Sequence, residues 1–181
     1  MKELDKTVAA GDLDASAAHF HTIAGNVPEI EDFTFLSEFY RGLTLLRDDQ
    51  SAEAVKAFEN SVKLPEAYNV PRYLLQARVG AAYDNHDYRN FLEFSKQGLV
   101  YDTSATAWAR VASAYSCLYV TEKSDSLLTS TQLYVDKTRL VGDTTRELAV
   151  YLNLIEYRVA MNKIVDRKDF EEKFPNGWTK N

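Results

Sequence analysis

A repeating pattern of small and large side chains is the feature that most constrains this chain. Four segments align so that Phe20, Phe58, Ser95 and Val135 fall in register, at steps of 38, 37 and 40 residues. Repetition at such a period is typical of stacked helical hairpins, because one hairpin cannot bury its apolar face alone and neighbouring hairpins share a core. The repeat therefore predicts a stack of similar units.

The spacing of apolar residues predicts helices within each unit. Phe35, Phe39, Leu43 and Leu46 recur at helical intervals, and no segment alternates convincingly between apolar and polar residues. The 181 residues include only 7 Gly and 4 Pro, too few for the tight turns of a β-sandwich or β-barrel. We therefore predict an all-α fold.

Charge and composition exclude several classes of partner. The net charge of -6 leaves no basic surface for a phosphate backbone, so we expect no nucleic acid partner. No apolar run approaches the roughly 20 residues of a membrane-spanning helix, so we expect no membrane insertion of this segment. With one cysteine and no segment resembling a secretory signal, the sequence favours a cytoplasmic location.

The sequence carries none of the familiar catalytic motifs. It has no phosphate-binding GxxxxGK[ST] loop, GxSxG elbow, HExxH pair or CxxC pair. His19 and His21 are two residues apart on a predicted helix, so their side chains point to nearly opposite faces and do not share a metal ion. We expect no enzyme activity, no cofactor and no metal site, and we interpret Cys117 as a structural thiol.

Within each unit, the pattern resembles the tetratricopeptide repeat. The spacing W-x2-L-G-x2-Y is matched by Trp108, Val111, Ala112 and Tyr115, and the spacing A-x3-F-x2-A by Ala54, Phe58 and Ser61. The resemblance implies a right-handed superhelix of antiparallel helical hairpins. The observed steps exceed the 34 residues of the family, which indicates extra residues between hairpins.

This alignment gives a domain map. We expect one domain over residues 1–181, as a fragment of a longer chain, with hairpins at about 1–28, 35–66, 72–103 and 104–142. Capping helices are expected at about 144–174, with Thr144 and Glu147 as a capping box at their start. Gly42, Gly80 and Ala112 should let the two helices of a hairpin approach closely.

The resemblance also implies where a partner binds, because the first helices of successive hairpins line the concave groove in this family. Carried over by alignment, the expected groove residues are Phe39, Tyr40, Leu43, Arg47, Arg78, Asn85, Arg110 and Ser113. The three arginines would form a basic strip suited to carboxylates, unless they pair with neighbouring Asp or Glu. Only Arg110 matches the carboxylate clamp of the chaperone-binding members, so chaperone tails are disfavoured.

We therefore expect a protein-interaction scaffold that holds a peptide or a partner helix in its groove, and the arginine strip favours an acidic one. The alternative is a self-association or regulatory domain of a larger protein, membrane-attached or not, whose activity lies outside this segment.

Overall fold

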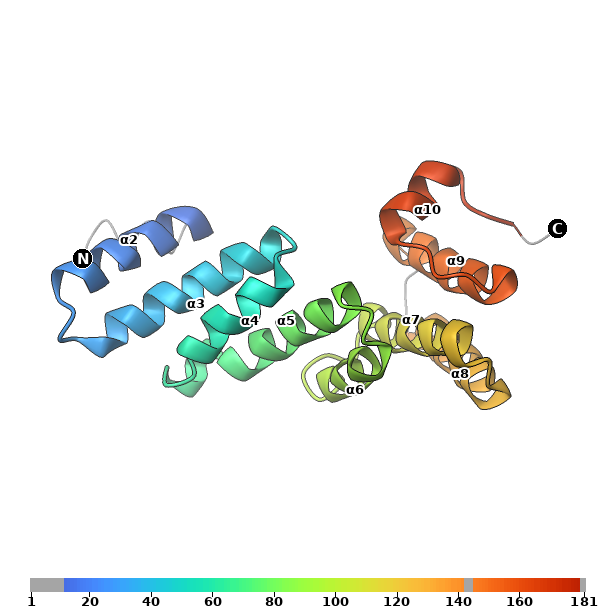
Figure 1. Ribbon diagram of the computed structural model, residues 1–181, viewed down its shortest axis with the longest axis horizontal. Helices are drawn as coiled ribbons and strands as arrows, with labels where there is room; N and C mark the ends of the chain where they lie inside the picture. The colour runs from blue at the N-terminus through green and yellow to red at the C-terminus, as the bar shows by residue number, and fades with distance from the viewer. Residues whose placement is uncertain (1–11, 142–144, 180–181) are drawn as a thin grey trace. The chain divides into compact units, whose positions relative to one another are not determined.

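The computed structural model describes residues 12–141 and 145–179, and all of their regular structure is helical. Nine α-helices and one short 3-10 helix occur in these ranges, with no strand, which confirms the all-α prediction. The helices belong to two compact units, Met1–Asn85 and His86–Asn181, which are described separately (Figure 1). Within each unit, helices pack on their neighbours in the chain.

Unit 1 is a row of four α-helices in which α3 packs against both α2 and α4, and α4 packs against α5. Asp12 begins α2 by accepting a hydrogen bond from the backbone N–H of Ala15 at 2.9 Å. Pro71 lies in the first turn of α5, where its missing N–H costs no helical hydrogen bond. The elements are α2 (Leu13–Asn26), α3 (Glu31–Arg47), α4 (Ser51–Asn60), the 3-10 helix η1 (Glu66–Tyr68) and α5 (Val70–Asp84).

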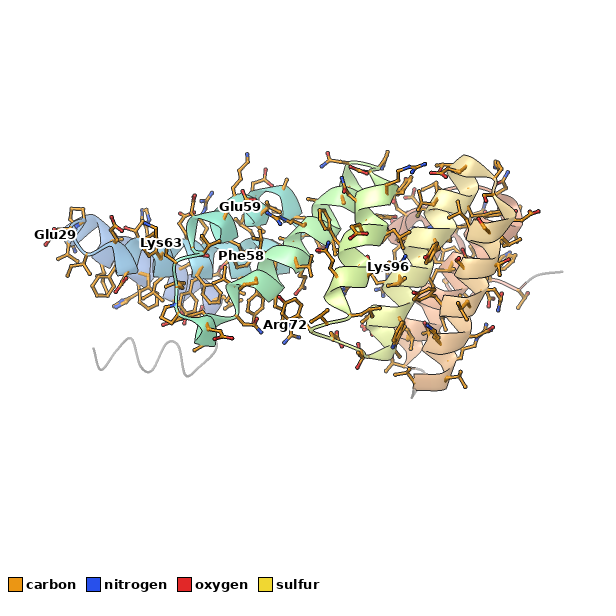
Figure 2. The ribbon with its side chains drawn as sticks, turned by 90° about the horizontal axis from the view of Figure 1, so that it is seen from below. Glu29, Phe58, Glu59, Lys63, Arg72 and Lys96 are labelled. Atoms are coloured by element: carbon orange, nitrogen blue, oxygen red, sulfur yellow. The ribbon has the colours of Figure 1, made fainter. Side chains whose placement is uncertain are left out.

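The core of unit 1 is a cluster of aromatic rings around Phe58, which is fully buried between helices (Figure 2). Its ring centroid lies 6.0 Å from that of Phe39 and 5.9 Å from that of Tyr73, and Phe39 lies 5.4 Å from Tyr68. Such edge-on and stacked pairs add to the free energy gained by burying the rings. The large residue of the repeat, Phe58 of α4, therefore fills the space that α4 shares with α3 and α5.

Gly42 makes this packing possible. A Cβ atom at Gly42 would lie 2.7 Å from the ring of Phe58, so the absent side chain lets α3 and α4 approach closely. Gly80 does not bring together the two helices of its own predicted hairpin. A Cβ atom there would lie 2.2 Å from Ser51 Oγ, so Gly80 admits the start of α4, the helix that precedes α5, and not the partner helix of its own predicted hairpin.

Unit 2 is arranged around α7, which packs against α6, α8 and α9. Ten residues of α7 are buried, mostly Ala and Ser, and these small side chains allow three helices to surround one. Ala109 and Ala112 are fully buried beside Val135 of α8 and Leu152 of α9. The helices of this unit are α6 (Tyr88–Gly98), α7 (Ala105–Glu122), α8 (Asp125–Val141), α9 (Arg146–Met161) and α10 (Arg167–Lys173).

The C-terminal helices lie within the ranges predicted for capping helices. Thr145, one residue beyond the predicted cap, begins α9 by accepting a hydrogen bond from the Leu148 N–H at 3.2 Å, and Thr144 lies outside the described residues. Helix α10 packs on α9 through Phe170, and the ring of Trp178 meets that of Tyr157 edge-on at 5.4 Å.

The predicted hairpins correspond to helix pairs only in part. The ranges 35–66 and 104–142 each contain two packed helices, α3 with α4 and α7 with α8. The range 72–103 contains α5 and α6, which belong to different units. The first helix expected in 1–28 lies outside the described residues, so the single continuous array stays a prediction.

In the described ranges, no helix combines the length and the apolar character needed to cross a membrane.

Replacing Gly42 with alanine should destabilise unit 1, because the new methyl group overlaps the Phe58 ring in a filled core. We expect a loss of about 1–3 kcal/mol in the free energy of unfolding, measured by urea denaturation. Gly25→Ala is the matched control, since a Cβ atom there meets nothing within 4 Å. Equal stability changes in the two variants would contradict the role assigned to Gly42.

Candidate functional site

One of the pockets of unit 2 has a volume of about 310 Å³ and lies between α7, the first turns of α9 and the start of α10. We call it the Arg110 pocket. Six of its seven lining residues carry a polar side chain, with two guanidinium groups, one carboxylate and three hydroxyl groups among them. The lining residues are Thr106, Arg110, Thr145, Glu147, Leu148, Tyr151 and Arg167.

Arg110 brings hydrogen-bond donors to this pocket. Its side chain is half-buried on α7, and within residues 12–141 and 145–179 no carboxylate forms an ion pair with it. A guanidinium group offers five N–H donors in a planar fork that fits two carboxylate oxygens. The pocket therefore suits an oxyanion.

The beginning of α9 adds to this electrostatic character. Thr145 caps a helix of 16 residues, and the partial positive charge of a helix N-terminus favours nearby anions. Glu147 lies in the same turn and also lines the pocket, so part of that positive potential is already compensated. Arg110 and Arg167 are the positively charged side chains of the lining.

The other two arginines of the predicted basic strip lie in unit 1 and are paired there. Arg47 forms a two-pronged contact with Asp14 at 2.9 and 3.1 Å and a second one with Asp48 at 2.9 and 3.2 Å. These hydrogen bonds raise the pKa of Arg47 and lower that of Asp48. Arg78 pairs with Glu59 at 3.0 Å. Of the predicted strip, Arg110 lines the pocket described above.

The predicted apolar anchors belong to the core of unit 1. Phe39 is 5% exposed, and Leu43 packs half-buried against the same cluster. Tyr40 stacks on Phe20 with ring centroids 5.1 Å apart, and burial raises the pKa of its hydroxyl. The Phe39 ring is therefore not an exposed anchor. Asn85 follows the end of α5, where its side-chain amide donates to the Ala81 carbonyl at 2.8 Å.

Ser113 lies beneath α9 and does not face an open groove. It is 1% exposed, and its hydroxyl oxygen accepts a hydrogen bond from Arg158 Nη1 at 2.9 Å. Arg158, itself 1% exposed, also donates to the Val165 carbonyl from Nε at 2.9 Å and from Nη2 at 2.7 Å. Helix α9 therefore covers the part of α7 that the repeat alignment assigns to the groove.

Sequence reasoning did not identify Arg158 or Arg167. Both lie after the last recognisable repeat, so no alignment assigns them a role. The contacts of Arg158 span 45 residues to Ser113 and 41 to Cys117, separations at which no short motif gives a signal. A charged residue among apolar positions of a predicted helix, as in Leu154, Ile155 and Arg158, was the one available indication.

The histidines and the cysteine do not form a reactive group. His19 meets Phe20 edge-on at 6.1 Å, and no cluster of three potential metal ligands occurs in the part of the chain that the structure describes. Cys117 is fully buried, and its burial raises the pKa of the thiol above the ordinary value. It lies 3.5 Å from Arg158 Nη1. These observations agree with a structural thiol.

Comparisons with protein-family models, with curated proteins and with solved structures found no match.

The Cys117 thiol should resist thiol–disulfide exchange with an added reagent in the folded protein. Burial excludes the reagent, and the raised pKa keeps the thiol protonated at pH 8, whereas the unfolded chain has an exposed thiol of ordinary pKa. Reaction with Ellman's reagent should be at least about 100-fold faster in guanidinium chloride than in buffer, in line with the low population of open states. Rapid reaction of the native protein would contradict the close packing of α9 on α7.

Proposed function

We propose that this chain is a helical-repeat module of the tetratricopeptide type that binds a protein partner. The sequential packing of helices within each unit and the tight contact of Gly42 with Phe58 support this proposal. On this reading, the hairpins wind as a right-handed superhelix. The long intervals between repeats accommodate η1 and the other connecting segments.

The binding site that we assign is the Arg110 pocket, and its ligand is an acidic segment of the partner. The observation that supports this assignment is that the Arg110 side chain lines the pocket and has no ion-pair partner in the described parts of the chain. A carboxylate of the ligand would supply that partner with a charge-assisted hydrogen bond. Phe39 is buried and Leu43 is half-buried in the core of unit 1, so these apolar residues of the predicted groove play no part in this site.

Binding is favoured over catalysis by the chemistry of the pocket. Its described lining contains none of the cysteine, histidine and serine side chains that most often act as nucleophile or base, and Glu147 is its one carboxylate. Arginine, threonine and tyrosine side chains are instead groups that hold an oxyanion by hydrogen bonds. A polar recess of this kind positions a charged group of a partner without changing it.

The proposal can be tested with a library of eight-residue peptides that vary the number of Asp and Glu residues and carry free or amidated carboxyl ends. Acidic peptides should bind more tightly than their Asn and Gln counterparts in fluorescence anisotropy. Arg110→Glu should weaken the best peptide by roughly 10–100-fold, the range expected for a hydrogen bond to a charged group.

The control is Arg72→Glu, which makes the same charge change at an exposed arginine of unit 1 (Figure 2). It should alter the affinity far less, and thermal unfolding should show both variants folded. If acidic and neutral peptides bind alike, or if the two variants weaken binding equally, the assignment of the Arg110 pocket is wrong.

A second candidate function is self-association through the outer face of α8. Leu140 is 85% exposed, Leu133 52% and Val141 48%, and exposed apolar residues on one helix are typical of an interface. Light scattering over a concentration series should then show a dimer that Leu140→Glu dissociates. A monomer at all concentrations would exclude this function.

A further inference from the structure

The Arg110 pocket has a second cation that the repeat pattern does not contain. Arg167 is the first residue of α10 and lines the same pocket as Arg110. Its Nε atom donates to Glu171 Oε1 at 2.6 Å, one helical turn away on α10. Both side chains of this pair are about half exposed, at 51% and 43%.

The position of Arg167 is fixed by the packing of α10. Phe170, three residues later, is 1% exposed and meets the ring of Tyr157 at 5.5 Å. Phe174 contacts the same two rings at 5.1 and 5.2 Å. A helix of seven residues is not stable alone, so this aromatic cluster holds α10 and with it the Arg167 side chain.

We propose that Arg167 is a second binding residue for the acidic ligand of the Arg110 pocket, and that Glu171 competes with the ligand for it. The inference rests on the proposed function and specifies the ligand class, a peptide that presents two negative groups. One group would bind Arg110 on α7 and the other Arg167 on α10.

Glu171 weakens the attraction of this site for an anion without blocking access to Arg167. Its one hydrogen bond to Arg167 leaves the remaining guanidinium donors available, and an exposed ion pair contributes little net free energy. Its negative charge, together with that of Glu147, offsets the two arginines. Neutralising Glu171 therefore makes the pocket more positive and releases Arg167, so affinity for an anion should rise.

The test measures the affinity of the full chain for the best acidic peptide of the library by fluorescence anisotropy. Arg167→Gln should weaken binding by about 3–10-fold, and Glu171→Gln should strengthen it by about 2–5-fold, magnitudes typical of partly exposed ion pairs. The matched controls are Lys168→Gln and Glu172→Gln, which make the same charge changes at exposed neighbours on α10. Each control should change affinity by less than half as much as its partner.

Two further measurements separate binding from folding and from general charge. Arg167→Lys keeps the positive charge and should retain most of the affinity if α10 is intact, which the fluorescence of Trp178 reports. The difference between Glu171→Gln and Glu172→Gln should persist at 0.3 M salt, because contacts at hydrogen-bond distance are screened less than distant charges.

The outcomes distinguish the two proposals. If the unchanged protein does not prefer acidic peptides, both are overturned. If Arg110→Glu abolishes binding while Arg167→Gln and Glu171→Gln behave like their controls, the Arg110 pocket stands and the role of Arg167 is wrong. If Glu171→Gln weakens binding, Glu171 is part of the ligand site and not a competitor.

Discussion

Close approach of helices, made possible by very small side chains, is the constraint on which both units depend. In unit 1, Gly42 leaves room for the ring of Phe58, so that α3 and α4 are nearer than two ordinary side chains allow. In unit 2, Ala109 and Ala112 of α7 serve the same purpose for α8 and α9. Adding or removing a single methyl group disturbs such contacts, because protein interiors are as densely packed as organic crystals.

The sequence was sufficient to predict helices, because they follow from local periodicity, and it predicted the close approach at Gly42 but not the helix that Gly80 meets. It could not decide which face of a helix meets solvent. Phe39 and Leu43 stand at groove positions by alignment, yet η1 supplies Tyr68 to cover Phe39. Arg47 forms an ion pair with Asp14, which lies 33 residues away in the sequence, and such pairs depend on tertiary structure that no short motif encodes.

In the candidate site, too, the sequence indicated one residue that lines the pocket and missed the tertiary contacts of another. Arg110 was predicted from its repeat position, and the structure places it in a polar pocket. Ser113, three residues later on the same helix, was predicted with it but lies under Arg158. A buried guanidinium group is costly unless its donors are satisfied, and the Val165 carbonyl and the Ser113 hydroxyl oxygen meet that requirement. The C-terminal helices thus cover one part of α7 and leave another accessible.

The shortness of α10 has a thermodynamic consequence. A seven-residue helix held by one aromatic cluster should open at a lower free energy than the helices around α7, and opening removes Arg167 from the pocket. Ligand binding and α10 docking are then linked equilibria, and each must favour the other by the same amount. A peptide bound at Arg110 and Arg167 would therefore slow amide hydrogen exchange throughout α10, including at residues that it never touches.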